Sequence, residues 1–280
     1  MHLREAGHEV IRLVRRAPQP PDERLWNLRT GHIEPGALDG AEAVINLGGT
    51  NIGGKRWNDA YKQELRESRI SPTAVLARAV AEHGVPVMIS GSAVAYYGDT
   101  GATAVDETSR PGSGFLVQLC RDWEAATRPA SDAGACVVLV RTGADLAADG
   151  DLIKSVRPMF SYGLGGRIGS GRQSTPWITL DDEIGAISHA LESDTVRGPI
   201  NATAPTPVTN AKFTRALARQ LRRPAPWVIP KFAVRAMLGE FADESILVSQ
   251  RILPAVLDRD GHTFRYSTIT AALAVMVLGS

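Results

Sequence analysis

A short apolar segment followed by hydroxyl groups is the part of this sequence that could do chemistry. Residues 87–89 have the apolar character of a strand buried on both faces, and they lead directly into Ser90, Ser92, Tyr96 and Tyr97. Ligands of an open parallel sheet bind beyond the carboxyl ends of its strands, where hydroxyl groups can bond a substrate oxygen or relay a proton. The alternative is an ordinary strand followed by a polar loop, with both tyrosines packed beneath it.

Predicted strands and helices alternate around this segment, with glycines marking the turns. This alternation predicts an α/β fold with a doubly wound parallel sheet and helices on both faces. A helix ending at Gly7 is expected first. The predicted strands and helices that follow are strands at 8–14, 43–47, 85–90 and 136–140 and helices at 59–83 and 115–133.

The pattern changes after Arg141. The glycine-rich stretch 159–172 is typical of an ordered, functional loop, and we treat 159–177 as a substrate loop. We expect residues 1–225 to form the main domain and residues 226–280 a small, mainly helical C-terminal lobe. Further elements are predicted as strands at 176–180 and 199–202 and helices at 183–192 and 210–221.

Composition restricts the class of protein. The chain has 280 residues, 44% of them hydrophobic, with a net charge of +1, so no basic field favours nucleic acid or anionic lipid. Two cysteines indicate no disulfide framework. The apolar run at 271–278 is too short to cross a bilayer, and the first residues lack a signal-peptide core. We expect a soluble, cytoplasmic protein, and a homodimer stays open.

Motifs along nearly the whole chain resemble one family. The chain is similar to the extended short-chain dehydrogenase/reductase superfamily and, within it, to the sugar-nucleotide-epimerase-like "epimerase family" proteins with a C-terminal domain of unknown function. The motifs that carry the resemblance are Gly7-His-Glu-Val10, Ala43-Val-Ile-Asn-Leu-Gly48, Lys55-Arg-Trp57, Ser92-Ala-Val-Ala-Tyr-Tyr-Gly98, Leu119-Cys-Arg-Asp-Trp-Glu124, Leu139-Val-Arg-Thr-Gly143, Gly163-Leu-Gly-Gly166, Gly169-Ser-Gly-Arg-Gln173, Trp177, Asp181-Asp182 and Asn201-Ala-Thr-Ala-Pro205.

The resemblance implies a Rossmann-type fold that binds a nicotinamide dinucleotide. Such folds begin with a strand, a glycine-rich turn and a helix whose N-terminus receives the pyrophosphate. This sequence starts where that helix ends, so roughly 15 to 20 residues of the family pattern are absent by ordinary element lengths. We expect a truncated sequence rather than a natural domain without its central strand, whose neighbours would keep unpaired backbone groups.

A second departure concerns catalysis. The superfamily uses a Tyr-x-x-x-Lys pair, in which lysine lowers the pKa of the tyrosine so that the phenol can transfer a proton. Counting back from Glu124 places these positions at Leu116 and Cys120, which cannot do that chemistry. Either another group serves, with Tyr96 or Tyr97 the nearest phenols, or the protein binds a dinucleotide without the redox step. Ser92 matches the Ser/Thr position of the superfamily.

Several groups are candidates for cofactor binding. Arg15 and Arg16 follow a predicted strand where NAD-preferring folds place an acidic residue, and a guanidinium pair suits a 2′-phosphate. We therefore expect NADP rather than NAD, the alternative being a solvated basic turn. Small residues at the end of a strand let a cofactor approach the backbone. The remaining cofactor candidates are Leu47, Gly48, Gly49 and Ser90.

Arginines near aromatic residues form a candidate substrate set, because such groups suit a phosphate or a flat ring. The alternative is surface arginines and core tryptophans. The histidines show no spacing typical of metal ligands, so no metal is predicted. We expect an NADP-dependent oxidoreductase or epimerase-like enzyme that acts on a small substrate, with nucleotide-linked substrates included. The alternative is a catalytically inactive dinucleotide-binding sensor or regulatory protein. The substrate candidates are Arg56, Trp57, Arg172, Gln173 and Trp177.

Overall fold

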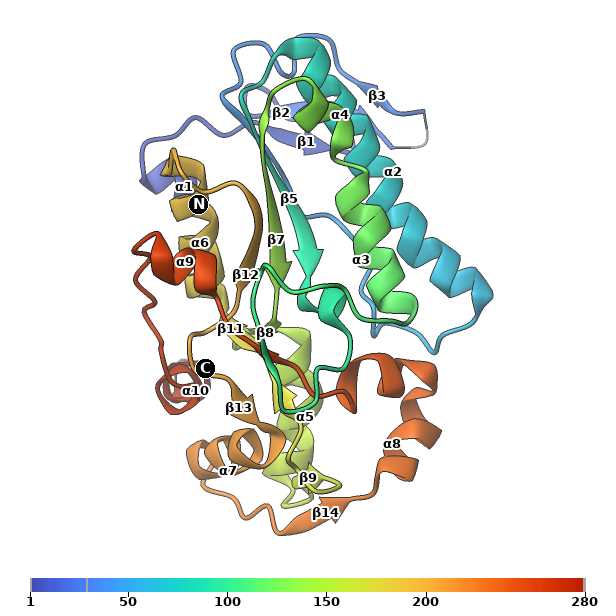
Figure 1. The fold of residues 1–280 in the computed structure, drawn as a ribbon, viewed down its shortest axis with the longest axis vertical. Coiled ribbons are helices and arrows are strands. Elements are labelled where there is room, and N and C mark those ends of the chain that lie inside the picture. Colours follow the sequence, from blue (N-terminus) through green and yellow to red (C-terminus); the bar gives the residue numbers. More distant parts are fainter. Residues whose placement is uncertain (1, 29, 279–280) are drawn as a thin grey trace.

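The fold is built on a four-stranded parallel sheet. The computed structural model describes residues 2–28 and 30–278, and its central strands are β4 (Ala43–Asn46), β5 (Val87–Ala93), β7 (Cys136–Thr142) and β12 (Gly198–Ala202). Their order is β12-β7-β5-β4, and all four carboxyl ends meet at one edge (Figure 1). This is the edge at which parallel α/β sheets bind ligands.

Helices cover both faces of the sheet. α2 (Asp59–His83), α3 (Phe115–Ala125) and α4 (Arg128–Asp132) lie on one face, and α6 (Leu180–Glu192) and α9 (Ala255–Arg259) lie on the other (Figure 1). Buried apolar residues of the strands pack against both layers. The predicted α/β class with a Rossmann-like, doubly wound parallel sheet is confirmed.

The helix predicted over residues 115–133 is divided into α3 and α4. The hydroxyl of Thr127 donates to the carbonyl of Glu124 at 2.7 Å, and Pro129 lies in the first turn of α4. Proline lacks the N–H that a continuous helix would need at this position. The break leaves α3 as the helix that borders the carboxyl end of β5.

A smaller sheet comes from the first part of the chain. β1 (Arg12–Val14) pairs in parallel with β2 (Glu23–Asn27), which pairs antiparallel with β3 (His32–Ile33). Among the residues that the structure describes, β1 and β4 do not pair with each other, so the strands fall into separate sheets. Preceding them, α1 (His2–Glu5) ends before Gly7, whose positive φ of 93° suits its predicted place at a helix end.

The buried stripe of α2 includes polar as well as apolar residues. The side chain of Asn58 accepts a hydrogen bond from the first turn, and Gly84, with φ of 65°, closes the helix as predicted. Leu65, Arg69 and Thr73 follow at intervals of four and are all buried. An arginine therefore lies where helical periodicity predicts a core residue.

The glycine-rich stretch 159–172 is not the loop that its composition predicts. It contains the end of α5 (Asp151–Ser161) and β9 (Gly166–Ile168), which pairs in parallel with β14 (Trp227–Ile229). A Cβ on Gly166 would lie 2.5 Å from the carbonyl oxygen of Trp227. Glycine is therefore needed here for close approach of two strands.

Residues 226–280 contact several parts of the preceding chain. β15 (Arg251–Ile252) pairs with β6 (Ala104–Val105), and the side-chain amide of Gln250 donates to the carbonyls of Val94 at 3.1 Å and Gly98 at 3.0 Å. The boundary at residue 225 stays a prediction. The other elements are β8 (Ala144–Leu146), β10 (Ser174–Thr175), β11 (Trp177–Thr179), β13 (Val208–Thr209), α7 (Asn210–Gln220), α8 (Lys231–Leu238), α10 (Ile269–Leu278), the 3-10 turn η1 (Val94–Tyr97) and the π-helical turn η2 (Ala242–Ile246).

None of the helices in the described part of the chain combines the length and apolarity needed to span a membrane.

Candidate functional site

A buried ion pair lies at the carboxyl ends of β5 and β7. Nε and one terminal nitrogen of Arg141 donate to the two carboxylate oxygens of Glu124 at 2.8 and 2.9 Å. The Ser92 hydroxyl donates to the same carboxylate at 2.7 Å. Burial is the largest single influence on the pKa of Arg141 and lowers it, but hydrogen bonding and charge interactions with Glu124 and Tyr97 together outweigh burial, so that pKa is raised overall. The arginine is therefore a permanent cation held against a carboxylate.

The polar network continues to the tyrosines. The other terminal nitrogen of Arg141 donates to the Tyr97 hydroxyl at 2.9 Å, and Tyr97 donates to Oδ1 of Asn201 at 2.8 Å. Burial raises the pKa of Tyr97 to about 12, although Arg141 acts in the opposite direction. The guanidinium also lies 3.5 Å from the centre of the Tyr96 ring.

The fold thus brings Ser92, Tyr96 and Tyr97 together, as their proximity in sequence predicted. We call the connected set of Ser92, Glu124, Arg141, Tyr97 and Asn201 the buried polar chain. Sequence reasoning missed the parts of Arg141 and Asn201. A charged residue inside the apolar run that forms β7 was the available signal. The catalytic roles of the serine and tyrosines stay predictions.

The turn after β4 carries the predicted cofactor residues Leu47, Gly48 and Gly49. Leu47 is exposed, and the N–H of Gly48 donates to Oδ1 of Asn46 at 3.4 Å. A Cβ on Gly49 would lie 2.8 Å from Cζ of Arg69. Glycine at this position therefore allows a guanidinium to lie directly against the turn.

Arg69 is a second site residue that sequence reasoning missed. Its guanidinium donates to the carbonyl of Thr50 at 2.8 Å and lies 5.3 Å from the ring of Trp123. It is 9% exposed, and within the described residues it has no carboxylate partner. Burial lowers its pKa. A buried cation without a counter-charge next to a glycine turn suits an anionic ligand group.

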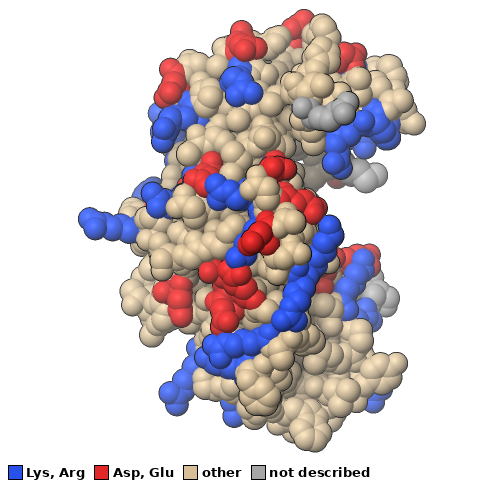
Figure 2. Space-filling model, turned by 90° about the vertical axis from the view of Figure 1, so that its right-hand side faces the viewer, with Lys and Arg blue, Asp and Glu red and all other residues tan. Residues whose placement is uncertain are grey.

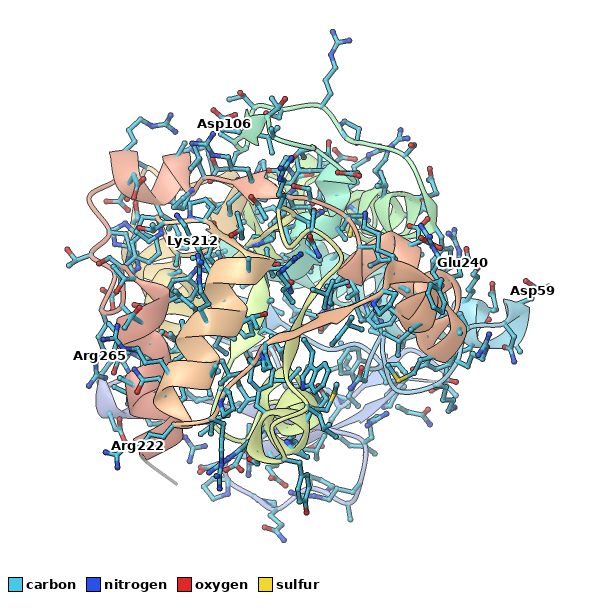
Figure 3. All side chains as sticks on the ribbon, turned by 90° about the horizontal axis from the view of Figure 1, so that it is seen from below. Asp59, Asp106, Lys212, Arg222, Glu240 and Arg265 are labelled. Atoms are coloured by element: carbon cyan, nitrogen blue, oxygen red, sulfur yellow. The ribbon has the colours of Figure 1, made fainter. Side chains whose placement is uncertain are left out.

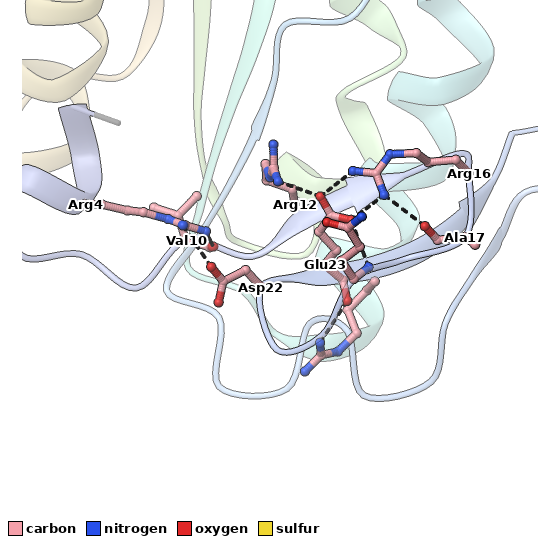
Figure 4. A network of polar contacts seen from close by, with 9 residues as sticks. Arg4, Val10, Arg12, Arg16, Ala17, Asp22 and Glu23 are labelled. Carbon is pink, nitrogen blue, oxygen red and sulfur yellow. Dashed lines mark hydrogen bonds and ion pairs between the residues drawn. The ribbon is translucent and has the colours of Figure 1, made fainter.

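The two arginines predicted to bind a 2′-phosphate have different partners. Arg16 is paired with an acidic side chain, whereas Arg15 has no acidic partner among the described residues. Both terminal nitrogens of Arg16 donate to the carboxylate of Glu23 at 2.7 Å each, and Arg12 donates to the same carboxylate (Figure 4). Hydrogen bonding to Arg16 lowers the pKa of Glu23. Arg15 is exposed and contacts no acidic group among the described residues. The sequence has no acid directly after β1, but β2 supplies one.

Ser90, the last predicted cofactor residue, is buried within β5. Its hydroxyl donates at 3.3 Å to the carbonyl of Gly91. Beside it in register is Asn46, whose amide donates to Thr73 at 2.9 Å. In this structure Ser90 therefore faces the protein interior.

The predicted substrate residues lie in two groups. Arg56 donates to the carbonyl of Ala236 in α8 at 3.0 Å, and the Trp57 ring lies 5.2 Å from Phe115 and 5.5 Å from Phe241. This first group joins the α2–α3 side to the α8–η2 connection. Seen from below, the labelled Asp59 and Glu240 lie on the same side of the molecule (Figure 3).

Charges at this junction are largely paired. Lys62 contacts Glu240 at 2.5 Å, and Arg235 contacts Asp243 at 2.8 Å. Figure 2 shows acidic and basic side chains intermixed over the middle of this side of the molecule. The junction therefore offers an aromatic cluster rather than a field of one sign.

The second group consists of Arg172, Gln173 and Trp177, and two of these three side chains are buried. Trp177 is 1% exposed, and its indole N–H donates to the carbonyl of Thr206 at 3.2 Å, so it is a core residue. Gln173 is buried and bonds the carbonyl of Ile168 at 3.2 Å, whereas Arg172 is exposed. Of this group, only Arg172 offers a free polar side chain.

The positions of the usual tyrosine and lysine are filled by packing residues. Leu116 and Cys120 are 4% and 3% exposed, and burial raises the pKa of Cys120 to about 12. The thiol is therefore neutral at physiological pH and cannot replace a lysine. In the described residues, no group of three or more His, Cys, Asp or Glu side chains could hold a metal ion.

Two of the cavities formed by the described residues are relevant to the position of the site. One of about 300 Å³ lies between the η1–α3 connection and η2, with Ala95, Gly112, Ser113 and Glu244 among its lining residues. The other, of about 240 Å³, lies beside β3 and the last turns of α2, away from the buried polar chain. The first is the one next to the tyrosines.

A doubly wound parallel sheet with polar groups at its carboxyl edge defines a Rossmann-like α/β protein. The model of the NAD dependent epimerase/dehydratase family matches residues 1–202, and that of a domain of unknown function, DUF1731, matches residues 229–276. The chain belongs to the NAD dependent epimerase/dehydratase family. The resemblance inferred from the sequence motifs is confirmed.

Individual relatives agree with this assignment. The epimerase family protein Mb2239 of Mycobacterium bovis is 52% identical over 271 residues, which cover 97% of this chain and 90% of the relative. The structure of human epimerase family protein SDR39U1 (isoform 2) with NADPH is 31% identical, with a TM-score of 0.91, over 100% of this chain and 94% of that chain. A nucleoside-diphosphate sugar epimerase from Corynebacterium glutamicum is 39% identical, with a TM-score of 0.80, over 99% and 54%.

Proposed function

We propose that this protein is an NADP-dependent oxidoreductase or epimerase-like enzyme for a small substrate, with nucleotide-linked substrates included. The observation that carries the proposal is the buried polar chain at the carboxyl ends of β5 and β7, with the unpaired cation Arg69 beside the neighbouring turn. A sheet edge of this kind is where Rossmann-like proteins bind dinucleotides. A cytoplasmic location and a homodimer are part of the proposal.

The residues present fit an anionic dinucleotide in two places. Arg69 offers a buried charge with no carboxylate partner among the described residues, and the exposed Gly48 leaves its backbone open to approach. Arg15 offers an exposed guanidinium that suits a 2′-phosphate. The solved relative from human contains NADPH, which supports NADP over NAD. Such a cofactor supplies hydride chemistry when bound.

Of the two phenols, Tyr96 is the better candidate for proton transfer. The Tyr97 hydroxyl is held between Arg141 and Asn201, and its pKa of about 12 keeps it neutral. Tyr96 is more exposed than Tyr97, and its hydroxyl has no hydrogen bond within the described residues. Ser92 would orient a substrate oxygen only after its hydroxyl turns from Glu124.

The rival function is a dinucleotide-binding sensor that carries out no turnover. It is favoured by one observation, the apolar pair Leu116 and Cys120 at the positions of the missing tyrosine and lysine. Both functions share the cofactor site, so only chemistry separates them.

The test is a fluorescence titration of the full chain with NADPH and NADH, followed by exchange of labelled hydride between NADPH and a panel of carbonyl compounds. The enzyme proposal expects tighter binding of NADPH and measurable exchange. Binding without exchange supports the sensor. Absence of binding by either dinucleotide contradicts both.

A further inference from the structure

Basic residues are concentrated in one part of this near-neutral chain. Residues 152–175 and 207–239 contain eleven of the 31 Lys and Arg residues and none of the 30 Asp and Glu residues. The first range includes β9 and all of α5 except Asp151, and the second includes α7, β14 and α8. We call the part of the molecule formed by these two ranges the basic lobe. The net charge of the whole chain conceals it, because acidic residues elsewhere offset its cations.

The two ranges fold into one unit. Phe160 of α5 and Leu217 of α7 belong to the same buried core. β9 pairs with β14, and Ile168 of β9 packs against the core that contains Val234 of α8. Seen from below, α7 with the labelled Lys212, β14 and α8 lie across the molecule (Figure 3). The face shown in Figure 2 agrees, because blue and tan side chains form its lower end and the red ones lie above them.

Most cations of the basic lobe lack a counter-charge. Lys154 lies 3.9 Å from Asp149, and Arg235 pairs with Asp243 at 2.8 Å, so two cations are neutralised by acids at the borders of the lobe. Eight further cations, all exposed except the half-buried Arg167, form no salt bridge in the described part of the chain: Arg167, Arg172, Lys212, Arg215, Arg219, Arg222, Arg223 and Lys231. Like charges on one surface repel each other, and an anionic partner removes that repulsion.

Exposed apolar side chains are concentrated in the same lobe. It holds seven of the eleven large hydrophobic residues that are exposed in the described part of the chain: Met159, Tyr162, Leu164, Trp227, Val228, Phe232 and Met237. Tyr162 is 82% exposed and Phe232 is 73% exposed. The indole N–H of Trp227 donates to the carbonyl of Gly163 at 2.9 Å, so the segments that carry Tyr162 and Trp227 adjoin. Exposed apolar side chains gathered in this way mark an interaction surface.

The combination of cations and apolar side chains favours one kind of partner. A second copy of the chain would bring a second set of unpaired cations to the interface, so charge opposes self-association through this face. Single-stranded nucleic acid would use the cations and the rings, but bases stack on rings and leave Leu164, Val228 and Met237 unused. An anionic membrane surface uses both kinds of group, because phosphates meet the cations while aromatic and aliphatic side chains enter the boundary with the acyl chains.

We infer that the basic lobe is a docking surface for the anionic headgroups of a membrane, on which the protein lies without crossing the bilayer. Tyr162, Trp227 and Phe232 enter the headgroup region, while Arg222 and Arg223, close to Trp227 in sequence, contact the phosphates. The near-zero net charge argues against such binding for the chain as a whole, but the charge of this lobe favours it. The residues assigned to the cofactor site all lie outside the basic lobe, so the inference goes beyond the proposed function and does not depend on it.

The experiment is co-sedimentation of the full chain with vesicles of phosphatidylcholine alone, or of phosphatidylcholine and phosphatidylserine in equal parts, at low and at physiological salt. We expect binding to the mixed vesicles alone, with an affinity that falls as salt rises. R222E/R223E should bind at least tenfold more weakly, and F232S should bind severalfold more weakly. R121E/R128E makes the same change of charge at exposed arginines of α3 and α4, outside the lobe, and should bind like the wild type.

Circular dichroism melts establish that each variant is folded. Absence of binding to the mixed vesicles at low salt overturns the inference, and so does equal binding by the wild type and R222E/R223E. A labelled single-stranded RNA and sedimentation velocity test the other partners. If RNA but not vesicles binds, and R222E/R223E abolishes it, the lobe is a nucleic-acid surface instead. If vesicles do not bind and F232S converts a dimer into a monomer, the lobe joins two copies of the chain instead.

Discussion

The hydroxyl of Ser92 donates to Oε1 of Glu124 at 2.7 Å, the same oxygen that Nε of Arg141 contacts at 2.8 Å. The serine that the family resemblance presents as a substrate ligand is therefore also part of a buried ion pair. Its hydroxyl can donate to a ligand oxygen only by giving up this bond, so donation to a ligand and the ion pair are coupled.

Replacing Glu124 with Gln should destabilise the protein strongly. The change keeps the shape of the side chain but leaves Arg141 buried without its counter-charge, which costs about 3–5 kcal/mol in comparable buried pairs. The free energy of unfolding in urea measures the effect. Glu82→Gln, on the exposed side of α2, is the control and should stay within about 0.5 kcal/mol of the wild type. Equal stabilities for both variants would show that the pair contributes little.

Tyr97 should be a late-titrating phenol. Its pKa of about 12, raised by burial, means that ionisation is delayed beyond that of exposed tyrosines. An ultraviolet titration of the five tyrosines should contain a final step that Tyr97→Phe removes and Tyr96→Phe leaves in place. Loss of that step in Tyr96→Phe instead would reverse the assignment.

Arg69 should contribute to dinucleotide affinity. Arg69→Leu removes a buried cation and should weaken NADPH binding roughly 10- to 100-fold, the size of one or two charged hydrogen bonds. Arg78→Leu, on the exposed side of the same helix, should bind like the wild type. A fluorescence titration compares the three proteins. Equal affinities would remove Arg69 from the proposed site.

Replacing Arg15 should change cofactor preference, whereas replacing Arg16 should change stability. Arg15→Ala should reduce the preference for NADPH over NADH roughly tenfold or more, since only its guanidinium is free for a 2′-phosphate. Arg16→Ala should instead lower the melting temperature, because the buried Glu23 loses its bidentate partner. Parallel binding and melting measurements distinguish the two. A lost preference in Arg16→Ala alone would assign the phosphate to the other arginine.

Asp145→Asn should stabilise the protein in a pH-dependent way. The pKa of Asp145 is raised by burial, so the folded state holds its proton more tightly than the unfolded chain. In the wild type, the stabilisation that this proton gives is complete below the pKa of Asp145 in the unfolded chain, and it is lost as pH rises through the pKa of Asp145 in the folded protein. The variant should therefore melt higher than the wild type at about pH 8, with the difference shrinking toward about pH 4. Asp149→Asn, at an exposed carboxyl, should show no such trend.

The parts of the fold that follow from local pattern were predictable. The helix at 59–83 and the strands around Ser92 agree with expectation because periodicity and glycine caps act over a few residues. Trp177 was misjudged for the opposite reason. Its core position depends on β11 pairing with β8 and on contact with Thr206, neither of which a local pattern shows.

Charge partners were the least predictable feature of the site. Glu23 reaches Arg16 only because β2 returns beside β1, and Arg69 lacks a carboxylate only because of what surrounds it in space. Sequence shows which residues are charged, whereas their neutralisation depends on contacts between distant segments. The charged residues of the cofactor site could therefore be named from the sequence, but not which of them are neutralised.

The bonds from Gln250 to the carbonyls of Val94 and Gly98 span about 150 residues of chain. During synthesis on the ribosome, the turn that carries Tyr96 and Tyr97 can therefore form these two bonds only after residue 250 has emerged. Contacts so distant in sequence form slowly, because a long loop must close first. The central strands end at Ala202, so they can pair before residue 250 is synthesised, whereas the tyrosine turn gains these two bonds only afterwards.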